Sequence, residues 1–378
     1  MFKHISVLFW FGFLFFQSTV FGQHALFIQI NDIPGTHVAD SIFIAGNFNN
    51  WNPGKKEYVF SKRANTYSIQ LQNIPKGIYE FKFTRGRWGN VECKSTGTDI
   101  ENHLLNLSSD TVVQYSVEAW KDDFTAEPKP HTASPNVQVI DTAFFMPQLQ
   151  TTRRIWIYLP EGYQSGNNRY PVMYMHDGQN IFDEFTAGFG EWGVDECLDT
   201  LIRNGKLPCI VVGIDNSPRR INEYNPYAFK QFGKGLGDKY VEFLVKNLKP
   251  FVDKKYRTKP GKNNTIIAGS SMGGLISYYA MLQYPNVFGK AGIFSPAFWT
   301  AKEINRLTAL RSKELDGRLF FYMGKLEGNE YVKDMNKIVE QLQKYPGINI
   351  YTIIDPNGRH NEVAWRKWFP EFYNYIIK

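Results

Sequence analysis

Residues 265–282 read TIIAGSSMGGLISYYAML, an apolar strand-like run followed by a glycine-flanked serine turn and a helix-like segment. The turn, Gly269-Ser270-Ser271-Met272-Gly273, places Ser271 at its apex with small residues around it. Small neighbours are needed because the backbone of such a serine is strained. Its Oγ would project above the sheet, where the first N–H groups of the helix face a developing oxyanion. A plain Gly/Ser turn is the alternative, and the strand-turn-helix setting favours Ser271 as a nucleophile.

A serine nucleophile needs a base, and the chain contains 7 histidines. Of these, His360 alone follows Ser271 in the sequence. It lies in the loop DPNGRHNE at 355–362, after the strand-like run 348–354. Loops beyond sheet strands commonly carry functional side chains, so chain order favours His360 as the base over an ordinary exposed loop histidine.

The acid that would orient this histidine should follow the strand before last, which we assign to 318–323. That strand is followed by GKLEGNE at 324–330, so Glu327 is the first candidate and Glu330 and Asp355 are the alternatives. The other acidic residues between the serine and the histidine are expected to solvate helix faces.

Composition indicates a packed globular protein of two domains, because the chain has 378 residues, of which 43% are hydrophobic and 16% aromatic. The net charge of +7 is spread without a long basic block, so a nucleic-acid partner is not expected. Cys93, Cys197 and Cys209 form no C-x-x-C pair. We therefore expect neither a metal nor another cofactor, while one disulfide remains open.

The N-terminus has the layout of a secretory signal peptide over residues 1–22. Lys3 and His4 precede an apolar run at 5–16, and VFG at 20–22 precedes Gln23. A retained membrane anchor is the alternative, although the apolar run is short for a span. Later apolar runs are broken by charges or glycines, so we expect a secreted or periplasmic protein without stable membrane insertion after cleavage.

Residues 23–120 predict a small β-sandwich, because short alternating runs at 25–30, 41–45, 67–71, 78–83 and 112–117 are separated by turn residues. GNFNNWNP at 46–53 and GIYEFKF at 77–83 resemble the carbohydrate-binding, immunoglobulin-like modules of starch- and glycogen-active proteins. The resemblance implies that sugar rings stack on exposed aromatics, for which Trp51 and Trp88 are the candidates. A tryptophan packed into the sandwich, in a docking or spacer domain, is the alternative.

The segment 121–136, KDDFTAEPKPHTASPN, predicts an interdomain linker stiffened by its prolines. From 137 to 378 strand-like and helix-like runs alternate, with strands expected at 153–160, 170–175 and 209–214 and helices at 193–204 and 236–254. This alternation predicts an α/β domain whose mostly parallel sheet is covered by helices on both faces.

The second domain resembles the putative esterase family of α/β-hydrolases, which contains esterase D, feruloyl esterases and enterobactin esterases. The likeness rests on YMHDGQNIFD at 174–183, on GIDN at 213–216 with Arg220, Glu223 and Tyr224, on 269–274 and on 358–365. It implies an ester hydrolase with an oxyanion hole formed by the Met272 N–H and, from the loop after 174–175, the Gln179 N–H.

Four further residues of this domain are candidates for substrate contact: Asp177, Asp215, Arg220 and Tyr224. They lie in loops beyond sheet strands, where ligands bind in such folds, and local salt-bridging is the alternative. His176 with Asp177 makes a poor metal site, because one histidine and one aspartate offer few ligands.

The favoured function is an exported serine esterase acting on carbohydrate-linked esters, such as acetyl or feruloyl groups, without a cofactor. One alternative keeps the chemistry and takes a siderophore lactone of the enterobactin type. The other is a carbohydrate-binding protein whose hydrolase fold is catalytically silent.

Overall fold

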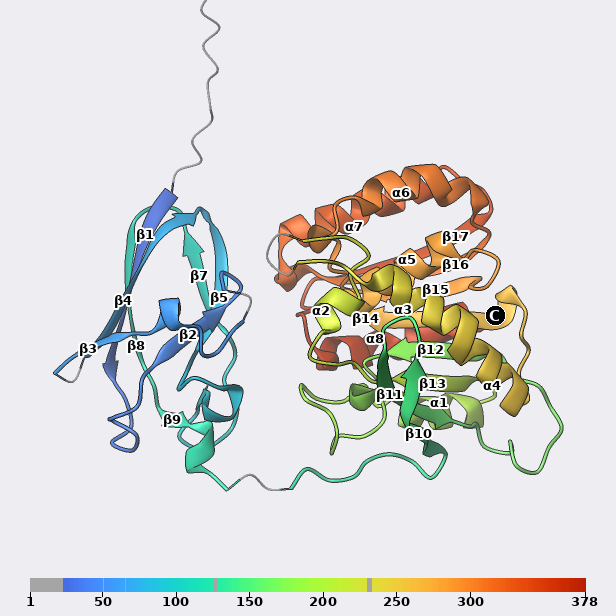
Figure 1. Cartoon of the computed structure of the whole chain (residues 1–378), viewed down its shortest axis with the longest axis horizontal. Helices are drawn as coiled ribbons and strands as arrows, with labels where there is room; N and C mark the ends of the chain where they lie inside the picture. Colours follow the sequence, from blue (N-terminus) through green and yellow to red (C-terminus); the bar gives the residue numbers. More distant parts are fainter. Residues whose placement is uncertain (1–22, 50, 65, 126–127, 230–232) are drawn as a thin grey trace, which may run out of the picture. The chain divides into compact units, whose positions relative to one another are not determined.

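The computed structural model describes residues 23–49, 51–64, 66–125, 128–229 and 233–378. The chain divides into two compact units, Met1–Glu127 and Pro128–Lys378, and the division falls inside the predicted linker (Figure 1). The predicted signal peptide, 1–22, lies outside the described residues. Within the described residues, no helix combines the length and the apolar character that crossing a membrane requires.

The regular elements of the first unit are strands and single-turn 3₁₀ helices. A four-stranded sheet has the order β3-β4-β1-β8, a three-stranded sheet the order β2-β5-β7, and β6 pairs with β9. Most neighbours are antiparallel, and β1 and β8 are parallel. The strands are β1 (Gln23–Asp32), β2 (Phe43–Gly46), β3 (Ser61–Arg63), β4 (Thr66–Pro75), β5 (Gly77–Thr84), β6 (Glu92–Cys93), β7 (His103–Leu107), β8 (Thr111–Ser116) and β9 (Ala119–Trp120).

The core of the first unit is formed by alternate residues of both larger sheets. Leu26, Ile28 and Ile30 of β1 are fully buried and belong to the same cluster as Phe81 and Phe83 of β5. Alternation of this kind buries one face of each strand, which is the pattern that the sequence shows at 25–30 and 78–83. The strands β3, β6, β7 and β9 were not predicted, and three of the four are too short or too exposed to show alternation.

The second unit is a mixed eight-stranded sheet with helices on both faces. The sheet order is β10-β11-β13-β12-β14-β15-β16-β17. The strands are β10 (Val137–Met146), β11 (Thr151–Tyr158), β12 (Val172–His176), β13 (Ile210–Ile214), β14 (Thr265–Ser270), β15 (Lys290–Phe294), β16 (Gly317–Gly324) and β17 (Ile348–Asp355). The α-helices are α1 (Val194–Arg203), α2 (Arg220–Glu223), α3 (Gly237–Phe243), α4 (Lys249–Lys255), α5 (Met272–Gln283), α6 (Ile304–Arg311), α7 (Asn329–Leu342) and α8 (Glu362–Ile376).

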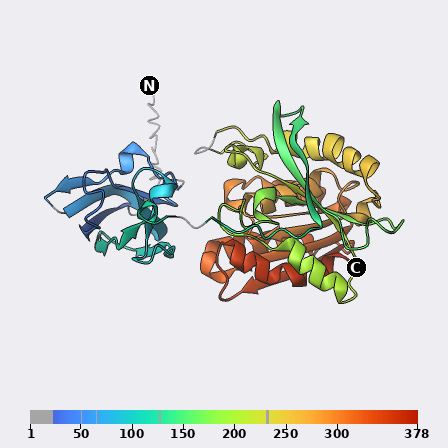
Figure 2. The ribbon, with the colours of Figure 1, turned by 90° about the horizontal axis from the view of Figure 1, so that it is seen from below.

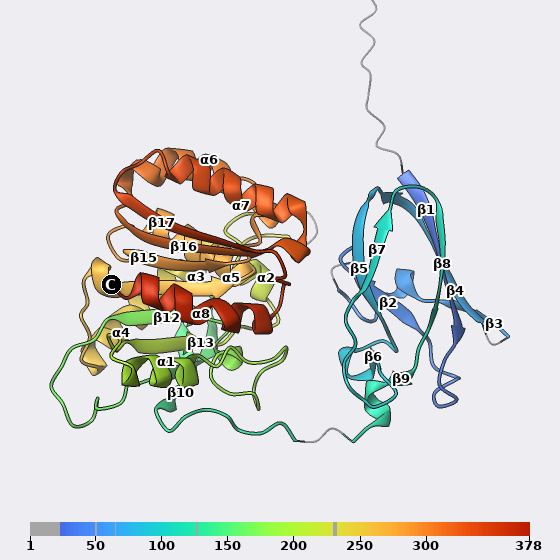
Figure 3. The same ribbon diagram turned by 180° about the vertical axis from the view of Figure 1, so that it is seen from behind.

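Alternate strand residues face two separate cores. Tyr174 and Ile267 pack in one cluster with α3, α5 and α7, whereas Met173 and Ile266 pack in a second cluster with α1 and α8. Figure 2 shows helices on either side of this sheet, and α1 and α8 are seen together from behind in Figure 3. The strands β13, β12 and β14 to β17 run parallel, so their carboxyl ends lie at one edge of the sheet.

Two details differ from the sequence prediction. The strand β10 pairs with β11 in an antiparallel hairpin at the sheet edge, where its largely exposed residues show no burial periodicity. The helix predicted at 236–254 is instead α3 and α4 joined by a π-helical turn, Leu244–Leu248. Pro250 lies just beyond this turn and has no N–H to donate, which shifts the local hydrogen-bond pattern.

Candidate active site

Ser271 occupies a strained turn between β14 and α5. Its backbone has φ 58° and ψ −119°, in a region that side-chain-bearing residues rarely adopt. The turn is held on both sides, because the Ser271 N–H donates to Phe294 O at 2.9 Å and its carbonyl accepts from Ala297 N at 3.0 Å. A Cβ on Gly269 would lie 3.0 Å from the Gly273 backbone carbon. The glycines therefore permit the close approach that this turn requires.

His360 lies directly before α8 and contacts Glu327. Its Nδ1 is 2.6 Å from Glu327 Oε2, and the Glu327 side chain is 3% exposed. Asn361 positions the histidine loop, because its side chain caps α8 by accepting from Ala364 N at 3.0 Å. Gly324, at the end of β16, allows this loop to come close, since a Cβ there would lie 2.4 Å from the Gly358 backbone.

The second carboxylate oxygen of Glu327 accepts two further hydrogen bonds. Glu327 Oε1 accepts from Ser295 Oγ at 2.6 Å and from the Gly324 N–H at 2.8 Å. Trp365 Nε1 donates to Ser295 Oγ at 2.9 Å, and the Trp365 ring stands edge-on to His360 at 5.1 Å. Sequence reasoning missed Ser295 and Trp365. The available signal was the position of Ser295 directly after a buried strand, the same position that singled out Ser271.

The two other proposed acids lie elsewhere. Glu330 is exposed near the start of α7. Asp355 is buried and accepts from Trp368 Nε1 at 2.7 Å, Lys367 Nζ at 3.0 Å and Asn357 N at 3.0 Å. Of the three candidates, the structure therefore brings Glu327 to the imidazole.

Ser271, Ser295, Glu327 and His360 follow the carboxyl ends of β14, β15, β16 and β17, four neighbouring parallel strands. Backbone bonds join Ser271 to the residues flanking Ser295, and Ser295 in turn donates to Glu327. Ser271 Oγ makes no hydrogen bond among the described residues. Catalytic hydrogen bonds are often long before substrate binds.

The charge state of His360 is set by its carboxylate neighbour. Burial disfavours the imidazolium, but the hydrogen bond and the charge of Glu327 outweigh it, so the pKa of His360 is raised from its ordinary 6.5. Glu362, at the start of α8, is a second buried carboxyl near the histidine that sequence reasoning missed. Burial raises the pKa of Glu362 to about 7.

The two predicted oxyanion donors lie at ordered backbone positions. Met272 is the first residue of α5, where an N–H has no acceptor within its helix. Gln179 lies in a 3₁₀ turn, Gly178–Asn180, directly after β12. The Gln179 carbonyl accepts from Thr186 Oγ1 at 2.7 Å and its Oε1 accepts from Asn216 N at 3.1 Å, which together orient the loop.

Asp177, Arg220 and Tyr224 form one cluster at this loop, in which Asp177 and Tyr224 are buried and Arg220 is partly buried. Arg220 donates from Nε and Nη2 to the two carboxylate oxygens of Asp177, both at 2.7 Å. Burial alone would raise the pKa of Asp177, but the Arg220 guanidinium reverses this and lowers it. Arg220 also lies 5.3 Å from the Tyr224 ring centre, and Tyr224 is fully buried. All three side chains thus hold the β12 loop against α2.

Asp215 is bound away from this cluster. Its two oxygens accept from Arg154 Nε at 2.7 Å and Trp156 Nε1 at 2.8 Å, so it ties the end of β13 to β11. This geometry corresponds to the salt-bridging alternative.

His176 also has a partner within the protein, because its Nδ1 lies 2.9 Å from the Tyr240 hydroxyl. Burial lowers the pKa of His176 to about 3.

Exposed apolar side chains lie on the loops next to the site. Leu326 precedes Glu327 and is 51% exposed, and Val363 near the start of α8 is 75% exposed. Trp299, in the loop after β15, is 39% exposed and contacts Phe229 edge-to-face at 5.8 Å.

In the first unit, Trp51 and Trp88 lie side by side. Their ring centroids are 6.2 Å apart at an interplanar angle of 37°, and Trp88 is 40% exposed. Trp51 has φ 55°, and its N–H donates to Gly46 O at 2.9 Å. Asn49 of the same motif is buried and bonds the backbone of Ile44 and Gly46, which shapes the loop that presents Trp51.

The second unit belongs to a known family. A family model described as "Putative esterase" matches residues 147–373, so the chain is a member of that esterase family. The match includes the serine turn, the acid loop and the histidine loop. The fold and the site thus define an esterase-type α/β-hydrolase.

Particular relatives are similar over parts of the chain. Uncharacterized protein YbbA of Bacillus subtilis is 28% identical over 47% of this chain and 70% of its own length. An endo-1,4-beta-xylanase/feruloyl esterase of Xylanibacter ruminicola is 29% identical over 59% of this chain, but the match spans only 29% of that enzyme. The enterobactin esterase FES of Shigella flexneri, solved in the presence of enterobactin, is 17% identical and covers 89% of this chain and 87% of its own with a TM-score of 0.54. At that identity the likeness concerns the fold alone.

Proposed function

We propose that this chain is an exported serine esterase that hydrolyses carboxylic esters linked to carbohydrate. The observation that supports the proposal best is the hydrogen-bonded series from Ser295 through Glu327 to His360 at the strand ends next to the strained Ser271. A base held by a buried acid beside a strained serine is the arrangement that acyl transfer requires.

In the proposed mechanism Ser271 Oγ attacks the ester carbonyl while His360 takes its proton. Glu327 holds the imidazole and stabilises its charged form. The backbone N–H groups of Met272 and Gln179 receive the oxyanion of the tetrahedral intermediate. His360 then protonates the leaving alkoxide, and water repeats the sequence to release the acid.

Two observations support a carbohydrate-linked substrate with an aromatic acyl group. The Xylanibacter relative is a xylanase/feruloyl esterase. Trp299 and Leu326 offer apolar surface beside the site, which suits a feruloyl group better than acetyl. In the first unit, Trp51 and Trp88 would provide a separate stacking surface for sugar rings.

The test is an assay of the mature chain on methyl ferulate, p-nitrophenyl acetate, acetylated xylan and a tri-catecholate lactone. We expect the aromatic ester to be cleaved best, and Ser271→Ala to lower kcat by about 10⁶. Ser270→Ala, which removes the neighbouring hydroxyl, is the matched control and should keep its activity. Preference for the lactone would favour the siderophore alternative, and absence of turnover on every ester would refute an enzymatic function.

A further inference from the structure

Three carboxylates meet where the loop after β12 enters α1. They belong to Glu191, Asp195 and Glu196, and one oxygen from each lies within 4.8 Å of the others. Glu191 and Asp195 are buried, and Glu196 is exposed. None of the three takes part in the proposed ester chemistry.

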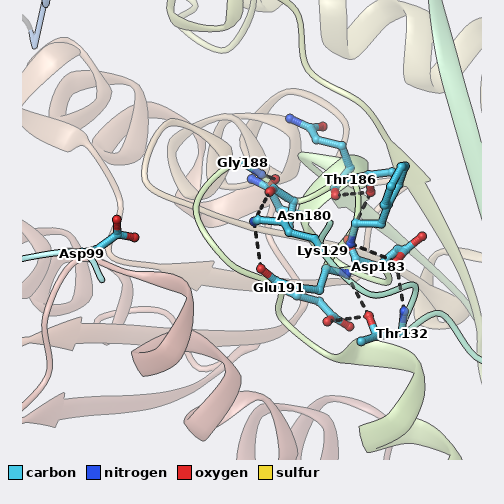
Figure 4. A network of polar contacts seen from close by, with 12 residues as sticks. Asp99, Lys129, Thr132, Asn180, Asp183, Thr186, Gly188 and Glu191 are labelled. Atoms are coloured by element: carbon cyan, nitrogen blue, oxygen red, sulfur yellow. Dashed lines mark hydrogen bonds and ion pairs between the residues drawn. The ribbon is translucent and has the colours of Figure 1, made fainter. Parts of the chain in front are cut away.

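One oxygen of each buried carboxylate binds the segment that leads into the second unit. Glu191 Oε2 accepts from Thr132 Oγ1 at 2.8 Å (Figure 4). The same oxygen lies 3.4 Å from Arg366 Nη2. Asp195 Oδ2 accepts from the Ser134 N–H at 2.6 Å. These bonds attach residues 132–134 to the loop and to the start of α1.

The other oxygen of each has no such contact. Glu191 Oε1 and Asp195 Oδ1 are enclosed and have no hydrogen-bond partner among the described residues. Leaving a carboxylate oxygen desolvated and unpaired is costly, and here two lie in one cluster with a third carboxylate. A cation bound between these two enclosed acceptors would compensate for the missing donors.

We propose that Glu191, Asp195 and Glu196 bind a hard divalent cation, with Ca²⁺ the best fit. Oxygen ligands lie about 2.3–2.6 Å from Ca²⁺, so two ligands of one ion are at most about 5 Å apart. The three carboxylate oxygens, which lie within 4.8 Å of one another, meet that limit. The exposed position of Glu196 leaves room for water to complete the coordination.

The consequence would be a tighter attachment of the linker end to the loop that carries Gln179. Thr132 N donates to Asp183 Oδ1 at 3.1 Å and Thr132 Oγ1 accepts from Glu184 N at 2.8 Å. Thr186, in the same turn, donates to the Gln179 carbonyl. A cation at this cluster would therefore stabilise the loop from which the second oxyanion donor comes.

The test is calorimetric titration of the EDTA-treated full chain with CaCl₂, together with its thermal unfolding. We expect binding of one Ca²⁺ per chain and a higher Tm in its presence. Asp195→Asn should abolish both effects, and Glu196→Gln, at the exposed edge, should weaken binding by about tenfold or more because affinity follows the number of charged ligands. Glu340→Gln, an exposed acid on α7, is the matched control and should bind as the parent chain does.

Three outcomes would overturn the proposal. The first is the absence of both binding heat and a Tm shift at millimolar Ca²⁺, Mg²⁺ or Mn²⁺, and the second is undiminished binding by both Asp195→Asn and Glu196→Gln. The third is a Tm that does not change with EDTA and falls only as the pH rises through 7. The last would mean that the cluster holds a shared proton in place of a metal. Because the readouts are binding and unfolding, they do not depend on esterase activity.

Discussion

Strained backbone positions mark the loops after β12, β14 and β15, three neighbouring strands of the second unit's sheet. Asp177, Ser271 and Ser295 have φ values of 60°, 58° and 43°, and each directly follows a sheet strand. Strain of this kind persists only where surrounding contacts hold it, and it concentrates at functional sites. Here the three residues shape the loop after β12, the serine turn and the loop from which Ser295 donates to Glu327.

Glu327→Gln should lower kcat by about 10³–10⁴ with little effect on stability, because an amide cannot support the imidazolium and favours the wrong tautomer. Steady-state kinetics on the best ester checks this. Glu330→Gln, at the exposed start of α7, should leave kcat unchanged. Near-normal turnover by Glu327→Gln would exclude Glu327 as the acid of the triad.

The acid limb of the pH profile should lie above 6.5, because Glu327 raises the pKa of His360 and the base is active only when neutral. Activity thus rises with pH through the raised pKa of His360. In Glu327→Gln the acid limb of the profile should move to lower pH. Burial raises the pKa of Glu362 to about 7, so the pH profile of Glu362→Gln should be measured too. An acid limb that moves in this variant and not in Glu327→Gln would assign the limb to Glu362.

At the scale of elements, the Asp177–Arg220 ion pair joins the loop after β12 to α2 and lies against the end of β14. Arg220 Nη2 also lies 3.3 Å from the Ser270 carbonyl, so one guanidinium contacts both the oxyanion loop and the serine turn. Its role as seen here is to position these two elements relative to one another.

Arg220→Met should reduce the free energy of unfolding by about 3–5 kcal/mol, since it leaves the buried Asp177 carboxylate unpaired. Urea unfolding followed by tryptophan fluorescence measures this. The double variant Arg220→Met with Asp177→Asn should recover part of the loss, and Arg306→Met, at an exposed position on α6, should lose little. A raised KM with unchanged stability would instead make Arg220 a substrate contact.

At the scale of the whole molecule, the chain combines an esterase unit with an all-β unit that carries a tryptophan pair. If the pair binds sugar, it would concentrate the enzyme on polysaccharide without altering its chemistry. Binding and catalysis would then respond to different substitutions.

Trp51→Ala and Trp88→Ala should each reduce retention on insoluble starch or xylan by up to about tenfold, because one stacked aromatic contributes about 0.5–1.5 kcal/mol. Hydrolysis of a small soluble ester should be unchanged. Phe189→Ala, which removes an exposed aromatic of the second unit, is the control for retention. If all variants are retained on the polysaccharide as well as the parent chain is, the first unit acts as a spacer and not as a sugar-binding module.

Much of the site could be predicted from local sequence. The serine turn is a local feature, because a buried strand, two glycines and a helix start determine its geometry. His360 followed from chain order. The choice among Glu327, Glu330 and Asp355 could not be made that way, since each lies in a plausible loop and only contacts across the sheet distinguish them.

The sequence by itself determined the alternation of strands and helices and the serine turn at 269–273, because these depend on short-range periodicity and steric limits. The tertiary structure alone decided which acid contacts His360, 33 residues away in the chain. It also decided that Ser295 hydrogen-bonds this acid and Trp365, and that Asp215 binds Arg154 of β11. It also gathered Glu191, Asp195 and Glu196 against residues 132–134. Such contacts depend on which strand ends become neighbours in the sheet, and that order is set by the packing of the whole unit.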